Sequence, residues 1–118
     1  MSYAKDAHVE KTLEEHSRHI MGQLMRFEKE VPLVPSSDVH VRAYFYGAIT
    51  AIARFCGHGR YETFVLACRY FVENLGVPME EVGEHVLHVQ FAPQETVQEW
   101  KKEGTHAFEA WCVASSCM

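Results

Sequence analysis

Several features that would assign a protein to a class at once are missing from this chain of 118 residues. The N-terminus has no apolar segment of the kind that a secretory signal requires. The longest uncharged apolar stretch, residues 43–53, is about half of the roughly 20 residues that cross a bilayer as a helix. These absences predict a soluble protein of the cytoplasm that does not enter the membrane.

A recognisable pattern of cysteines is missing too, so their spacing is uninformative. The four cysteines form no C-x-x-C pair or other metal-ligand spacing, and a reducing cytoplasm keeps thiols free. Cys56, Cys68 and Cys112 lie on or beside apolar helix faces, which predicts buried and unpaired thiols. Cys117, next to the last residue, is expected to be exposed. Cys56 stands close to His58 in the sequence, but a buried thiol is inert, so no thiol catalysis is expected.

Positive charge is scarce too. The formal net charge is −5, and residues 77–118 hold the whole excess, with seven acids against Lys101 and Lys102. An acidic surface repels phosphate backbones, so nucleic acid is not expected as a partner. The hydrophobic share of 47% and the charged share of 23% are ordinary for a globular protein. At this length, a single domain over residues 1–118 is expected.

Stretches of alternating polarity, the pattern of half-buried β-strands, are also missing. Apolar residues recur instead with the spacing of one helix face, and prolines and glycines separate the segments. In the first segment this apolar stripe consists of Val9, Leu13, Ile20, Leu24, Phe27 and Val31. We therefore predict an all-α fold, a compact bundle of four to five helices that are mostly antiparallel to their neighbours. The predicted helices cover about residues 4–30, 38–56 and 60–75, with a fourth that opens at Pro78 and a fifth that opens at Pro93.

The second predicted helix has two non-polar sides. On one of them, Ala43, Gly47 and Ala51 follow one another at four-residue intervals, a spacing that lets another helix approach closely. Two partners for this face are compatible with the sequence: the fifth helix, where Gly104 also permits close approach, or a second protein chain. We interpret Ala43, Gly47 and Ala51 as an interface, with a homodimer as its economical form.

Two H-x-x-H pairs, His16 with His19 and His85 with His88, are the best lead to metal chemistry. Residues three apart lie on the same side of a helix, so each pair offers two imidazoles to one ion. If the first and fourth helices pack by these flanks, the pairs and Glu81 could hold zinc, iron or nickel, or a haem. Eight histidines in one short chain make such pairs easy to obtain by chance, however. We therefore expect no bound metal or other cofactor.

The loop ARFCGHGRYE gathers Arg54, His58 and Arg60 around Gly57 and Gly59, just before a helix begins. Free backbone, positive side chains and a helix N-terminus are the components of a phosphate or carboxylate site. No Walker or G-x-G-x-x-G spacing accompanies them. Gly57 is equally well explained as the left-handed cap of the second helix. Both interpretations stay open.

Motifs that would indicate an enzyme are missing as well. No nucleophile elbow and no cofactor fingerprint occurs, so catalysis is not indicated. The preferred interpretation is a small helical protein that acts by binding another protein, as an adaptor, inhibitor or regulatory subunit. The alternatives are a metal- or haem-binding bundle that uses the paired histidines, and a sensor of a small anionic ligand at Arg54, His58 and Arg60.

Overall fold

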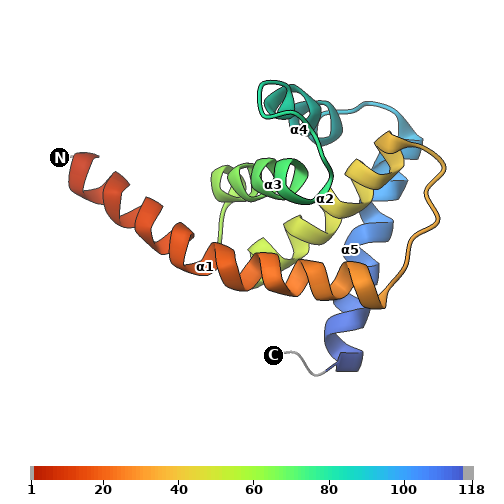
Figure 1. The fold of residues 1–118 in the computed structure, drawn as a ribbon, viewed down its shortest axis with the longest axis horizontal. Coiled ribbons are helices and arrows are strands. Elements are labelled where there is room, and N and C mark those ends of the chain that lie inside the picture. Colours follow the sequence, from red (N-terminus) through yellow and green to blue (C-terminus); the bar gives the residue numbers. More distant parts are fainter. Residues whose placement is uncertain (1, 116–118) are drawn as a thin grey trace.

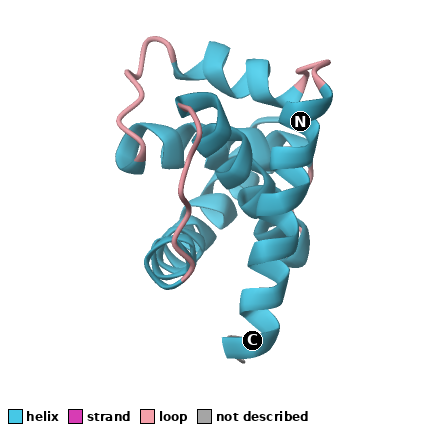
Figure 2. Cartoon of the chain, turned by 90° about the vertical axis from the view of Figure 1, so that its right-hand side faces the viewer, coloured by secondary structure: helices cyan, strands magenta, loops and turns pink. Residues whose placement is uncertain are grey.

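The computed structural model describes residues 2–115, with the side chains described from residue 15 onward. Within this range the chain forms five α-helices and no strand, which confirms the all-α prediction (Figure 1, Figure 2). None of these five helices has the length and the apolar character of a membrane-spanning segment. The helices are α1 (Ser2–Glu30), α2 (Asp38–Phe55), α3 (Arg60–Asn74), α4 (Val82–Gln90) and α5 (Glu95–Ser115).

The two ends of α2 follow from the sequence around them. The hydroxyl of Ser37 accepts a hydrogen bond from the backbone N–H of His40 at 3.1 Å, which satisfies one free N–H group of the first turn. At the other end, Gly57 has a φ of 82°. The N–H of His58 donates to the carbonyl of Ala53 at 2.8 Å. A left-handed glycine with this hydrogen bond closes a helix, so the capping role of Gly57 is confirmed.

The fourth helix begins later than predicted, at Val82 rather than at Pro78. The N–H of Glu81 donates to the carbonyl of Pro78 at 3.0 Å, so residues 78–81 form a separate turn. Val77 and Val82 are both buried and anchor the chain on either side of this turn. On one continuous helix, two residues five apart would point about 140° away from each other. The turn lets both valines face the core.

The most extensive helix contact in the described chain joins α2 and α5, and it depends on two glycines. A Cβ atom on Gly47 would overlap the carbonyl oxygen of Lys101, and a Cβ atom on Gly104 would overlap the carbonyl oxygen of Tyr44. The hydroxyl of Thr105 also donates to the carbonyl of Gly47 at 2.9 Å. Only glycine allows the two backbones to come this close, so the small-residue face of α2 packs against α5 within the chain.

The interpretation of Ala43, Gly47 and Ala51 as an intermolecular interface is therefore corrected. Ala43 and Gly47 are buried within the chain, and Ala51 is half-buried. Of the two partners that the sequence allowed for this face, the fifth helix is the one that Gly47 contacts. Ala43 and Gly47 are therefore not available to a second chain.

The helices α2 and α5 run in the same general direction, whereas the sequence predicted mostly antiparallel neighbours. Contacts advance together along the two helices, from His40, whose ring stacks on Trp100 at 4.7 Å, to Gly47, which is bonded to Thr105. Both helices start at the upper right of Figure 1 and descend from there. An antiparallel arrangement is expected of helices joined by a short loop. Here α3 and α4 intervene in the sequence, so the chain returns to the start of α2 before α5 begins.

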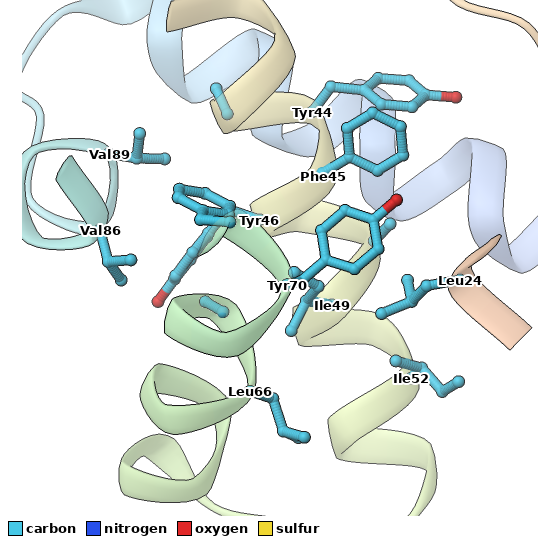
Figure 3. Packing of buried hydrophobic residues seen from close by; sticks show 14 of the residues in the cluster. Leu24, Tyr44, Phe45, Tyr46, Ile49, Ile52, Leu66, Tyr70, Val86 and Val89 are labelled. Carbon is cyan, nitrogen blue, oxygen red and sulfur yellow. The ribbon is translucent and has the colours of Figure 1, made fainter. Parts of the chain in front are cut away.

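Phe27 of α1 connects the helices through an aromatic cluster. Its ring is fully buried, and its centre lies 5.2 Å from that of Phe108, 5.7 Å from that of Trp111 and 5.8 Å from that of Tyr44. Aromatic pairs at these distances add to the free energy gained by burial. Figure 3 shows labelled side chains of α1, α3 and α4 gathered around those of α2. The core therefore has α2 at its centre.

The apolar stripe predicted for the first helix is present where side chains are described. Ile20, Leu24 and Phe27 are each 0% exposed, as residues spaced three and four apart on one helix face should be. Val9 and Leu13 belong to the same predicted stripe but lie outside the described side chains. The C-terminal half of α1 thus packs on the domain through a face that the sequence identified.

Candidate functional site

A cavity of about 430 Å³ opens between α2, α3, α5 and the end of α4. The three residues that the loop sequence singled out, Arg54, His58 and Arg60, all line it. Lys101 joins them from α5, so we call this cavity the cationic pocket. The rest of the wall is polar or aromatic and consists of Tyr46, Thr50, Gly59, Thr63, Gln90 and Phe91.

The cations of the pocket have no ionic partners. Arg54, Arg60 and Lys101 make no ion pair with any carboxylate in the described part of the chain. Elsewhere, arginines of α1 and α3 pair with glutamates one turn away, at 3.5 and 3.6 Å. No carboxylate lines the pocket, although the chain has 16 acids against 11 lysines and arginines. Unpaired cations around a concave surface create a local positive potential, which is the electrostatic condition for binding an anion.

Lys101 is the pocket residue that the sequence reasoning missed. Its Nζ donates to the carbonyl of Gln90 at 3.1 Å and lies 5.7 Å from the centre of the Tyr46 ring. Burial lowers the pKa of Lys101, because the charged amine loses part of its hydration. A lysine has three N–H donors, so those not bonded to Gln90 are available to a ligand. No local motif links Lys101 to the loop, since only the α2–α5 contact brings it there.

Three hydroxyl groups complete the polar wall of the pocket. Burial raises the pKa of Tyr46, while the charge of Arg60 and a hydrogen bond with Thr50 act in the opposite direction, so the phenol is protonated at neutral pH. Thr50 and Thr63 each donate to the carbonyl four residues earlier in the chain, both at 2.8 Å. These bonds fix the two threonine side chains in the wall.

The N-terminus of α3 lies at the same pocket. Gly59 is its N-cap and supplies no side-chain hydrogen bond, so the first N–H groups of the helix are left for water or a ligand. The carboxylate of Glu62 lies 3.3 Å from the position that a Cβ atom on Gly59 would take. This carboxylate competes with an incoming anion for the helix end. The attraction for an anion therefore comes mainly from the side-chain cations.

The candidate metal ligands are not brought together. His16 and His19 lie on α1, and His85 and His88 lie on α4, with α3 between the two helices (Figure 1). Glu81 is exposed just before α4 begins. Among the residues that the structure describes, no group of three or more potential ligands could hold a metal ion. The metal site required the first helix to pack on the fourth, but each of these helices packs on α2 and α3 instead.

Each of these histidines either contacts other residues of the chain or is exposed. Nδ1 of His16 lies 3.2 Å from Nε2 of His58, with the two rings edge to face. Nδ1 of His85 accepts a hydrogen bond from Arg42 at 3.2 Å. His19 lines a second cavity, described below, and His88 is exposed. The contact of His16 with His58 ties α1 to the loop that forms the cationic pocket.

One histidine that the sequence did not single out is buried. Nδ1 of His40 accepts a hydrogen bond from the N–H of Ser36 at 3.0 Å, so the ring proton of the neutral form is on Nε2. Nε2 then donates to the carboxylate of Glu103 at 3.1 Å. Both ring nitrogens are satisfied, and the ring stacks on Trp100. His40 therefore joins the start of α2 to α5 and has no nitrogen left for a ligand.

The second cavity, of about 560 Å³, lies on the other side of α2, between α1 and α5. Its wall is mainly apolar and includes Phe55 and Val113, which are 68% and 75% exposed. Gln23 also lines it, and the side-chain oxygen of this residue is buried without a hydrogen-bond partner in the described chain. We call this cavity the apolar groove.

The cysteines are less buried than predicted. Cys56 and Cys112 line the apolar groove, and Cys68 lies on α3; all three are half-buried. Cys56 and Cys68 carry free thiols, and burial raises the pKa of both. A raised pKa keeps a thiol protonated and slow to react, as expected for packing residues. Cys117 lies outside the described residues.

Comparison with known proteins finds no matching family model, no similar curated protein and no similar solved structure. The function therefore has to be argued from the residues of this chain.

Proposed function

We propose that the protein binds a small anionic molecule, a phosphate or a carboxylate, in the cationic pocket. One observation supports this most: three cations without ion-pair partners among the described residues line a single cavity, and no Asp or Glu is among its lining residues. In an acid-rich chain, such a cluster gains little from folding alone, because like charges repel one another. An anion would remove that repulsion.

The chemistry of the pocket residues suits phosphate and carboxylate ligands. An arginine presents a flat fork of donors that matches two oxygens of either group, and a lysine adds a mobile point charge. The volume of about 430 Å³ falls in the range of small-molecule sites. These contacts are the ones that a binding protein or a sensor of a small anion needs.

Calorimetric titration with inorganic phosphate, pyrophosphate and citrate tests the proposal. At least one of these anions should bind with one-to-one stoichiometry, and Arg60→Gln should weaken it about tenfold or more, as expected for a lost charge-assisted hydrogen bond. Lys102→Gln is the matched control, because Lys102 neighbours Lys101 on α5 but does not line the pocket. Equal affinities in the wild type and in Arg60→Gln would contradict the proposal, as would a failure of every anion to bind.

The pH dependence provides a second test at the same site. The charge of Lys101 is present below its pKa and is lost as the pH rises through it, and burial lowers that pKa. Anion affinity should therefore fall at a lower pH than that at which an ordinary lysine loses its charge. The decline should be absent in Lys101→Gln. An unchanged decline in that variant would assign it to another group.

A second candidate function, the binding of a protein partner, is favoured by the apolar groove. Phe55 and Val113 both expose large apolar side chains at this groove, and exposed apolar side chains that are grouped together are typical of interaction surfaces. We propose a second copy of the chain as the partner to test first, because two-fold symmetry would let Phe55 of each copy enter the groove of the other. The free thiols of Cys56 and Cys68 would suit a protein of the cytoplasm, where thiols stay reduced.

The mass in solution tests this second candidate. Sedimentation at increasing concentration should show a dimer in the wild type and a folded monomer in Phe55→Ser. Tyr61→Ser is the control, because Tyr61 is 66% exposed but lies outside the groove. A wild-type monomer at high concentration would rule out self-association at this surface.

A further inference from the structure

The cationic pocket contains one large apolar side chain that faces solvent. Phe91 is 67% exposed, whereas Tyr46, the other aromatic residue of the wall, is 8% exposed. A single exposed ring on a protein surface needs no explanation by itself. Phe91 is of interest because it lies in the wall of a charged cavity and because the backbone on both sides of it is held in place.

Two side chains of α5 hold the residues that flank Phe91. Lys101 donates to the carbonyl of Gln90 at 3.1 Å, and Gln98 donates to the carbonyl of Ala92 at 2.6 Å. The N–H of Phe91 itself donates within the last turn of α4, and Ala92 is 3% exposed. The ring therefore stands at the pocket on a fixed support. Holding an apolar ring in this way is what a stacking surface requires.

Gln90 adds a polar group beside the ring. Gln90 lines the pocket, and its side-chain amide makes no hydrogen bond with the described residues. An amide can both donate and accept a hydrogen bond, so it can pair with a polar edge of a flat ligand. The pocket thus combines charges for an anion, a ring for stacking and an amide for the edge of a ring.

We propose that the ligand is an anion carried on a planar aromatic ring, with its phosphate or carboxylate at Arg54, Arg60 and Lys101 and its ring against Phe91. This inference rests on the proposed anion-binding function. A nucleoside monophosphate and an aromatic carboxylate share this chemistry. The cavity of about 430 Å³ has room for either, whereas a lone oxyanion would leave most of it to water.

Calorimetric titration of the full chain with five probes tests the inference. The probes are inorganic phosphate, ribose 5-phosphate, adenosine monophosphate, adenosine and indole-3-acetate. A ring-bearing anion should bind about tenfold or more tighter than the probe that has the anion alone, as base stacking on an aromatic side chain provides. If adenosine monophosphate binds more tightly than indole-3-acetate, the natural ligand is a phosphate carried on an aromatic ring. If indole-3-acetate binds more tightly, the natural ligand is an aromatic carboxylate. Adenosine, which has no charge, should bind weakly.

Two variants complete the test. In Phe91→Leu the preference for the ring-bearing anion should shrink to about threefold or less, while the affinity for inorganic phosphate stays the same. In Phe55→Leu, which changes an equally exposed ring outside this pocket, the preference should be retained. Equal binding of phosphate, ribose 5-phosphate and adenosine monophosphate would overturn the ring inference and leave the anion site standing. A failure of all charged probes to bind would overturn both.

Discussion

The two cavities of this protein lie on opposite sides of α2 and have opposite chemistry. Tyr46, Thr50 and Arg54 follow one another at four-residue intervals and face the cationic pocket, while Ile52 and Phe55 face the apolar groove. A helix turns 100° per residue, so one segment can supply both walls without mixing them. The comparison teaches that each cavity can be changed separately, but that both depend on how α5 packs against α2.

The largest effect is expected where that common support is broken. Gly47→Ala places a methyl group on the carbonyl oxygen of Lys101, which is backbone and cannot move aside. Overpacking of this kind should destabilise the fold by about 3 kcal/mol or more, and it should impair both cavities. Chemical denaturation followed by circular dichroism measures the change.

Gly22→Ala is the matched control for this prediction. No atom lies within 4 Å of a Cβ on Gly22, which is in the exposed face of α1. Alanine there should stabilise the protein by up to about 1 kcal/mol, because glycine is a poor helix former. If Gly47→Ala unfolds at the same denaturant concentration as the wild type, the close α2–α5 contact is wrong.

The next largest effect is expected from variants that change one cavity and leave the other intact. Arg60→Gln should weaken anion binding about tenfold or more and leave the fluorescence of an apolar dye bound in the groove unchanged. Phe55→Ser should lower the dye signal and leave anion affinity unchanged. Either variant that altered both readouts would show that the cavities are coupled rather than independent.

A smaller effect is expected at Gln23, where the apolar groove contains a polar defect. The side-chain oxygen of Gln23 is buried without a hydrogen-bond partner in the described chain. Gln23→Met should therefore raise the free energy of unfolding by about 1 kcal/mol, because an unpaired buried acceptor is removed. Gln90→Met in the cationic pocket should bring no such gain, since that amide is not buried without a partner. Equal stability of Gln23→Met and the wild type would contradict the prediction.

The smallest effect is expected from metals. The histidines of α1 and α4 do not converge, so the protein purified without a histidine tag should contain no stoichiometric zinc, iron or nickel. Added zinc should leave the melting temperature within about 2 °C, since one weak site contributes little stability. Elemental analysis that finds one metal per chain, lost in His16→Ala or His85→Ala, would restore the metal interpretation.

Several features of the fold and the site could be predicted from the sequence. Ile20, Leu24 and Phe27 show the helical spacing directly, and Ser37 and Gly57 mark the ends of α2 by their own chemistry. The turn at residues 78–81 was missed, because a proline that can open a helix can equally open a turn. The buried pair of His40 and Glu103 was missed as well, since nothing local connects two residues on different helices.

The loop residues Arg54, His58 and Arg60 show which part of a site the sequence can predict and which part it cannot. Their nearness in the chain was enough to suggest an anion site, because a short loop keeps its side chains close together. Lys101 and Phe91 could not be predicted from nearness in the chain, because they reach the pocket from α5 and from the end of α4. The resulting pocket differs from the predicted site by a fourth basic side chain and an exposed ring.

The sequence by itself determined the helices, their apolar faces and most of their ends, because these depend on dihedral preferences and on contacts within a few residues. Only the tertiary structure decided that Gly47 and Gly104 meet, that α5 runs alongside α2 in the same direction, and that the histidine pairs are kept apart. Those outcomes depend on which helix faces exclude the most water from one another. The pairing of helix faces depends on all the helices together, so it cannot be read from any single segment.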